Sequence, residues 1–212
     1  MVEEGIMIAR WIIACALGLT PGVSSALYCG EITNAFGPFD YTDPAHRGHD
    51  LQIVEGRHFT PEVEGLLKGT SSYIGADLDY TLRAFPNHHR ALQSMMLLSQ
   101  REKKPIPAGA RYTVECYFDR ALRFKPDDPT VLMLHGMFLN TQGKLDDAIA
   151  RVEKANQLLP NDANINYNLG LLYFDKRDFV KSREHAKIAY DLGFPLPGLK
   201  NKLTKVGQWE GN

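Results

Sequence analysis

The chain has 212 residues, of which 44% are hydrophobic, and its 24 lysines and arginines nearly balance its 25 aspartates and glutamates. This balance gives no basic field for nucleic acid, so we expect no nucleic-acid partner. The length suffices for one domain with a continuous core, even after removal of an N-terminal leader.

Residues 1–26 resemble a secretory signal peptide. Arg10 precedes the apolar run 11–19, and a helix-breaking Pro21 and small residues up to Ala26 follow it. The run is shorter than the roughly 20 residues that span a bilayer. We therefore expect cleavage after Ala26, a periplasmic location and no stable membrane span in the mature protein. The alternative is a chain that an uncleaved leader anchors in the membrane.

Two of the three cysteines, Cys29 and Cys116, lie beyond this leader. In an oxidising compartment an even pair of cysteines favours a disulfide. The alternative is a pair of free, buried thiols, because the sequence alone does not test the geometry of a bridge.

Residues 27–75 are predicted to form an irregular N-terminal arm. The segment is rich in proline, glycine and aromatic residues and shows little helical periodicity. Its aromatic residues Phe36, Phe39 and Tyr41 are too apolar for a solvated tail. We therefore expect the arm to be ordered and to pack on the helices that follow.

Two short stretches of the arm carry a local signal. Leu51–Val54 is consistent with a short strand or an extended segment. Thr60, followed by Pro61 and Glu62, predicts the start of a short helix, with a capping hydroxyl and a proline in the first turn.

A helical array is predicted over residues 76–212. Its first helix places apolar residues on one stripe and stops at Pro86, after which Asn87 is expected to cap the next helix. A break with two prolines, 101–111, comes before another helix. The apolar residues of the two helices before that break are Leu78, Leu82 and Phe85, then Leu92, Met95 and Met96.

The strongest signal is a repeat with a period of 34 residues in the second half of the chain. Residues 129–160 and 163–195 each read as two helices joined by a polar turn, and a longer unit, 88–126, precedes them. Gly136 and Gly170 lie inside the first helices, where glycine costs roughly 1 kcal/mol relative to alanine, which favours close helix packing. Leu169, Gly170, Tyr173, Phe179 and Ala189 lie 34 residues after His135, Gly136, Leu139, Leu145 and Ala155.

At these residues the chain resembles the tetratricopeptide repeat (TPR) family, in a bacterial exported form. The resemblance implies an all-α fold: a helix-turn-helix repeat array, or TPR solenoid, of about three repeats, closed by a C-terminal capping helix in 196–212. The departures are His135 in place of leucine, Asn166 in place of tryptophan and Ser182 in place of alanine. None of them removes a helix.

The resemblance also implies a binding groove, because the first helix of each unit lines the concave face in this family. Each of the last two first helices carries an apolar stripe at i, i+4, i+7 spacing, beyond the face used for packing. An ordinary core stripe is the alternative. The candidate groove residues are Met133, Met137 and Asn140 in one unit and Tyr167, Leu171 and Phe174 in the next.

The sequence predicts no catalytic residue, no cofactor and no metal ligand. His46 and His49 have no partner at metal-ligand spacing, and the adjacent His88 and His89 diverge on a helix. We expect a non-enzymatic periplasmic scaffold that binds a protein or peptide. The alternatives are a metal-binding or small-ligand-binding protein or enzyme that uses the histidines of the arm, and an accessory subunit of an envelope assembly.

Overall fold

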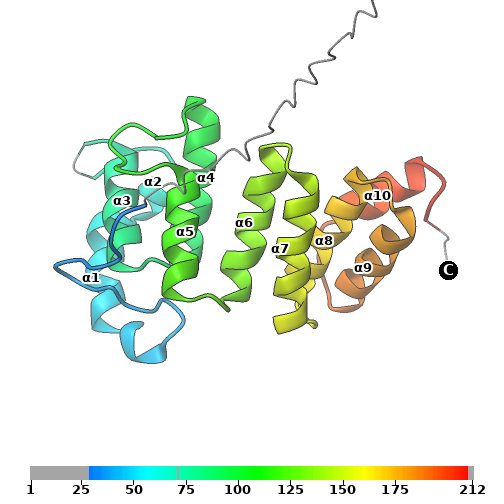
Figure 1. The fold of residues 1–212 in the computed structure, drawn as a ribbon, viewed down its shortest axis with the longest axis horizontal. Helices are drawn as coiled ribbons and strands as arrows, with labels where there is room; N and C mark the ends of the chain where they lie inside the picture. The colour runs from blue at the N-terminus through cyan, green and yellow to red at the C-terminus, as the bar shows by residue number, and fades with distance from the viewer. Residues whose placement is uncertain (1–28, 71, 210–212) are drawn as a thin grey trace, which may run out of the picture.

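The computed structural model describes residues 29–70 and 72–209, so the predicted leader, 1–26, lies outside the described residues. Within these two ranges the chain forms ten α-helices, one 3-10 helix and no strand. Figure 1 shows the helices side by side in an elongated array, with α1 to α5 at one end and α8 to α10 at the other. The all-α prediction is confirmed.

The helices follow one another with short connections, apart from a long loop between α4 and α5. No helix of the described ranges is long and apolar enough to cross a membrane. In chain order the elements are η1 Pro44–His46, α1 His49–His58, α2 Pro61–Glu64, α3 Ile74–Ala84, α4 His89–Glu102, α5 Val114–Phe124, α6 Pro129–Thr141, α7 Leu145–Leu158, α8 Ala163–Asp175, α9 Phe179–Asp191 and α10 Gly198–Lys205.

Three helix pairs make up the array: α4 with α5, α6 with α7, and α8 with α9. The turns after α6 and α8 fall at the polar residues expected from the sequence. The two glycines inside first helices explain how closely the pairs pack. A Cβ on Gly136 would lie 2.4 Å from Val152 Cγ2, and one on Gly170 would lie 2.6 Å from Leu199 Cδ2. Both positions therefore need glycine for close helix approach.

Side-chain caps fix where the first helices begin. Asp128 accepts hydrogen bonds from the backbone N–H groups of Thr130 and Val131 at the start of α6, and Asp162 caps α8 in the same way. The cap of α4 is His88, whose side chain accepts a hydrogen bond from Ala91 N, so the prediction of Asn87 was wrong. Asn87 instead makes long-range hydrogen bonds, which its position one residue before the cap does not reveal.

The arm packs on the array, as predicted, but it is partly helical. Phe36, Phe39 and Tyr41 pack against a small cluster that includes the buried Val54 and Phe85. Leu51–Val54 lies in α1 and not in a strand. The helical pattern was hidden because one side of a short surface helix suffices to bury Val54.

The structure also bears out the start of α2 at Pro61. Its N-cap residue is Thr60, although the Thr60 side chain makes no capping hydrogen bond to the backbone.

A disulfide joins Cys29 to Cys116 across 87 residues of sequence, as the sequence predicted. It fixes the start of the arm against α5. Beside it Arg120, which is 1% exposed, donates through Nη1 to the carbonyl oxygens of Cys29 and Glu31. The arm is thus held at α5 by a covalent bond and by a buried guanidinium.

The C-terminal helix α10 closes the array. Leu199 and Leu203 are fully buried and form a cluster with Ala186 of α9. The lysines of α10 remain exposed. This helix is the polar-faced cap that the sequence predicted.

Candidate partner-binding surface

The first helices α4, α6 and α8 are neighbours and share one face of the array. A hollow of about 210 Å³ lies between these three helices at their N-terminal ends. Arg90 and Gln93 of α4, Met133 of α6 and Asn164 of α8 line it, with other residues of the same helices. We call the part of this surface that α4 and α6 form the α4–α6 face.

A buried carboxylate sets the relative position of α4 and α6. Asp128 is fully buried; besides capping α6, it accepts a hydrogen bond of 2.9 Å from Nε2 of His89, a residue of α4. Burial alone would raise the pKa of Asp128, but hydrogen bonds from His89, Val131 and Asn87 outweigh it and hold this pKa below its ordinary value. The ionised carboxylate therefore joins the ends of two helices that line the hollow.

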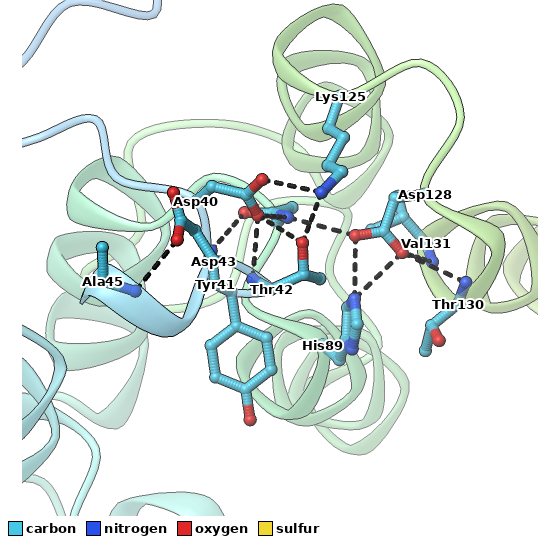
Figure 2. Close-up of polar contacts among 11 residues, drawn as sticks. Asp40, Tyr41, Thr42, Asp43, Ala45, His89, Lys125, Asp128, Thr130 and Val131 are labelled. Atoms are coloured by element: carbon cyan, nitrogen blue, oxygen red, sulfur yellow. Dashed lines mark hydrogen bonds and ion pairs between the residues drawn. The ribbon is translucent and has the colours of Figure 1, made fainter. Parts of the chain in front are cut away.

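The same network reaches the arm, as Figure 2 shows. Asn87 Nδ2 donates to Asp128 Oδ2 (3.1 Å) and to Asp40 Oδ1 (2.7 Å), and Asp40 also accepts from Lys125 Nζ (2.7 Å). Burial would raise the pKa of Asp40, yet the hydrogen bonds from Lys125, Asn87 and Thr42 lower it strongly. The arm, α4 and the start of α6 thus form one polar unit beneath the α4–α6 face.

The α6 residues of the predicted groove lie on this face. Met133 is 9% exposed and lines the hollow, and Met137 is half-buried against the core. Asn140 is half-buried, and its side-chain N–H lies 3.4 Å from Asp175 Oδ2. Asn168 Nδ2 lies 3.4 Å from Met133 Sδ, so polar amides from α8 border the methionines.

The α8 residues of the predicted groove have an occupant within the chain. Tyr167, Leu171 and Phe174 are partly buried against the cluster that contains Leu199 and Leu203 of α10. The ring of Tyr167 also stacks on Phe194, with 3.9 Å between ring centroids. The structure therefore separates the two predicted triplets: the α6 triplet borders a hollow, and the α8 triplet lies under the capping helix. A binding role of these six residues stays a prediction.

The sequence analysis missed the α4 side of this face. Gln93, Leu97 and Gln100 occupy the positions of α4 that Met133, Met137 and Asn140 occupy on α6, counted from the caps His88 and Asp128. Leu97 is 43% exposed, which is high for a leucine on a helix that is otherwise well packed. The signal was the i, i+4, i+7 spacing, but the longer connection in this unit shifts the register to 40 residues.

The histidines of the arm pair with separate carboxylates. His46 Nδ1 lies 3.0 Å from Asp50 Oδ2, His58 Nδ1 lies 3.0 Å from Asp77 Oδ1, and His88 Nε2 lies 3.1 Å from Glu55 Oε1. Burial lowers the pKa of His88, although Glu55 opposes this shift. Among the described residues no group of three or more histidine, cysteine, aspartate or glutamate side chains is placed to hold a metal ion.

The residues that depart from the repeat pattern are all used in packing. His135 stacks on Phe118, and its Nε2 lies 3.3 Å from Glu115 Oε1. Asn166 Nδ2 donates to the carbonyl oxygens of Pro160 and Asp162, and Ser182 Oγ donates to Gly170 O. Each polar substitution therefore has a hydrogen-bond partner within its own or the neighbouring helix pair.

Comparison with known proteins agrees with this architecture. A family model described as a TPR repeat matches residues 139–176, which run from the end of α6 to the end of α8. The chain is a tetratricopeptide repeat protein. Among solved structures, PilF of Pseudomonas aeruginosa superimposes on this TPR protein with a TM-score of 0.53 at 20% sequence identity, covering 74% of this chain and 68% of that chain. A point mutant of MamA matches with a TM-score of 0.39 and 18% identity over 67% of this chain and 93% of that chain.

No curated protein matches the chain in sequence. At 20% identity the likeness to PilF establishes the fold and nothing more specific. The function of this TPR protein must therefore be argued from its own surfaces.

Proposed function

We propose that this TPR protein is a non-enzymatic scaffold that binds a segment of a partner protein on its α4–α6 face. A TPR fold suggests a protein–protein interaction scaffold in general. The observation that carries the specific proposal is the hollow between α4, α6 and α8, bordered by two methionines and an exposed leucine. Flexible methionine side chains suit an apolar contact that adapts to a partner.

The position of α10 supports the choice of this part of the array. Because α10 covers Tyr167, Leu171 and Phe174, a partner that uses the first-helix surface has apolar side chains within reach mainly on α4 and α6. The amides of Gln93, Asn164 and Asn168 at the rim offer hydrogen bonds to an extended backbone. The expected partner is therefore a peptide segment with one or two apolar anchors.

We further propose that the protein acts outside the cytoplasm, in the periplasm. The leader-like residues 1–26 support export, and the disulfide between Cys29 and Cys116 suits an oxidising compartment. Intact-mass measurement on protein from a bacterial envelope fraction tests this proposal. A mass that retains residues 1–26 would contradict the cleaved leader and favour a membrane-anchored chain.

The binding proposal is tested by Leu97→Gln, with Val180→Gln as the matched control. Both residues are exposed, at 43% and 56%, but Val180 lies on α9, away from the α4–α6 face. Leu97→Gln should weaken capture of the partner that co-purifies with the wild-type protein by roughly tenfold, while both variants keep the wild-type thermal midpoint. Equal capture by wild type and Leu97→Gln would exclude the α4–α6 face.

Co-purification also distinguishes a transient scaffold from the accessory subunit of an envelope assembly. A subunit should elute with its neighbour at stoichiometric amounts even after high dilution, whereas a peptide-binding scaffold should release its partner. The enzyme or metal-binding alternative rests on His46, His49 and His58 of the arm. Metal analysis of the purified protein tests it.

A further inference from the structure

A second surface lies at one edge of the array, around the long loop between α4 and α5. Two neighbouring hollows, of about 510 Å³ and about 530 Å³, meet there and share the residues Glu115 and Lys144. The first lies between the C-terminal ends of α4 and α6, and the second lies between α5 and α7 with α6 beneath it. We call them together the loop-edge cleft.

Positive charge is concentrated in this cleft. Its lining includes five cationic side chains and two acidic ones, Glu115 and Asp147, in a chain whose lysines and arginines are otherwise balanced by acids. The cationic residues are Lys103, Lys104, Lys144, Arg151 and Lys154.

Four of these cations have no ion pair within the described residues. The lysine and arginine ion pairs there involve Arg83, Arg90, Arg111, Arg123, Lys125 and Lys176. Lys154 Nζ lies 3.5 Å from Pro126 O. Lys103, Lys104, Lys144 and Arg151 therefore remain available to an anionic partner.

The acid in the middle of the cleft is already engaged. His135 Nε2 lies 3.3 Å from Glu115 Oε1. This hydrogen bond lowers the pKa of Glu115, burial opposes the shift, and the charges of Lys144 and Arg151 lower it further. Glu115 therefore stays ionised and turned toward His135, and the net charge of the cleft remains positive.

Lysines near helix C-termini are favoured by the helix dipole, so their charge alone would not mark a binding surface. The floor and wall of the cleft add a second observation. The side chains of Val114 and Phe138, only 2% and 8% exposed, form an apolar floor to the first hollow. Its wall is the loop 103–113, which is absent from the other two repeats.

The loop is a built element and not a loose excursion. Val114 N donates to Pro105 O (3.1 Å), Lys104 N donates to Ser99 O (3.2 Å), and Ala108 N donates to Glu102 Oε2 (2.8 Å). A Cβ on Gly75 of α3 would lie 2.4 Å from Ala108 O, so the loop is packed tightly on α3. The insertion therefore holds Lys103 and Lys104 at the mouth of an apolar hollow.

From this geometry we infer that the loop-edge cleft binds an acidic protein segment that carries an apolar side chain. The apolar anchor enters the hollow over Val114 and Phe138, and carboxylates on either side of it pair with Lys103, Lys104, Lys144 and Arg151. The apolar floor and the near-neutral charge of the whole chain favour an acidic peptide over nucleic acid. The cleft adjoins the α4–α6 face at Gln100 but does not depend on the binding proposed there.

The test uses the full mature chain and a fluorescein-labelled probe peptide of glutamates with one central phenylalanine. Fluorescence anisotropy should show binding that weakens by about tenfold between low and physiological salt, because the charges are exposed. Replacing the glutamates of the probe by glutamines should abolish binding. Replacing its phenylalanine by glutamine should weaken binding by at least about fivefold.

The protein variants are Lys104→Glu and Lys144→Glu, with Lys205→Glu of α10 as the control. All three lysines are exposed, and Lys144 is an N-cap residue without a side-chain cap bond, so an acid there suits the start of α7. Each cleft variant should weaken binding of the probe by about fivefold or more, and Lys205→Glu should change it by less than about twofold.

Three results would overturn the inference. They are equal binding of the glutamate and glutamine probes, an equal loss of affinity in Lys205→Glu, and tighter binding of a single-stranded oligonucleotide than of the glutamate probe. Leu97→Gln separates the two surfaces, because it should leave binding of the probe within about twofold of wild type while it weakens capture on the α4–α6 face.

Discussion

The two ends of the array are held together in different ways. In the repeats α6–α7 and α8–α9, each helix packs mainly on its sequence neighbours, and glycine and alanine let the helices approach closely. At the other end, the arm and α3–α5 are joined by contacts between residues that lie far apart in the chain. Asp40 bonds to Asn87, Tyr117 donates to Asp79, and Cys29 is bonded to Cys116.

This difference bears on stability as well as on construction. Neighbour packing in a repeat array is divided among many similar contacts, so the loss of one contact is local. The arm instead depends on a few buried polar groups and one covalent bond, each of which is costly to lose. Substitutions at the arm end should therefore be more damaging than matched substitutions in the last repeats.

The largest expected effect is removal of the disulfide. In the chain-entropy account, closing a loop of this length stabilises the fold by about 4–5 kcal/mol. The double variant Cys29→Ser/Cys116→Ser should therefore lose most of that in urea unfolding, and reductant should destabilise the wild type by the same amount. If reductant leaves the wild-type transition unchanged, the bond does not hold the arm end together.

The second effect compares two helix caps. Asp128→Ala removes the cap of α6 together with the hydrogen bonds from His89 and Asn87, and should cost about 3 kcal/mol. Asp162→Ala removes the cap of α8, at Ile165 N, without such long-range contacts, and should cost about 1 kcal/mol. Urea unfolding of both variants measures the difference. Equal losses would show that the network beneath the α4–α6 face adds nothing to the cap.

The third effect tests how α10 uses the last repeat. Tyr167→Ala should cost about 2 kcal/mol, because the ring is partly buried, stacks on Phe194 and packs in the cluster of α10. Thermal unfolding measures the loss, with the exposed Val180→Ala as a control that should change little. An unchanged midpoint for Tyr167→Ala, together with weaker partner capture, would return this residue to the binding groove.

The contrast between the two ends also explains what the sequence predicted. The repeats α6–α7 and α8–α9 were predictable because helix packing imposes a spacing that recurs every 34 residues, as at Gly136 and Gly170. The contacts of Asn87 and Arg120 were not predictable, because a buried polar group and its partner share no period in the sequence.

The candidate surface was predicted only in part, for a related reason. The apolar stripe on α6 and α8 has a helical spacing, which the sequence shows directly. Whether such a stripe stays open depends on which later segment packs on it, and α10 packs on Tyr167 and not on Met137. The longer loop 103–113 hid the matching stripe on α4 by shifting its register.

The smallest effect is a dependence of stability on pH, which contrasts one histidine at each end. Burial lowers the pKa of His88 in the folded protein, so the unfolded chain binds the extra proton first as the pH falls. The stability that the neutral His88 contributes is therefore fully present above the unfolded pKa, about 6.5, and is lost as the pH falls below it. Buried carboxylates such as Asp128 also have lowered pKa values, but their contribution is lost only below about pH 4.

The window just below about pH 6.5 thus reports on histidines and not on the carboxylate network. A single histidine contributes a slope of at most about 1.4 kcal/mol per pH unit. His88→Asn keeps a side chain that can cap α4 and should flatten the slope between about pH 6.5 and 5.5. Burial also lowers the pKa of His185, but this residue of α9 is only half-buried, so His185→Gln should flatten the slope less. Urea unfolding at several pH values measures both. A steeper slope lost in His185→Gln than in His88→Asn would mean that the last repeat, and not the arm end, carries the larger buried titration.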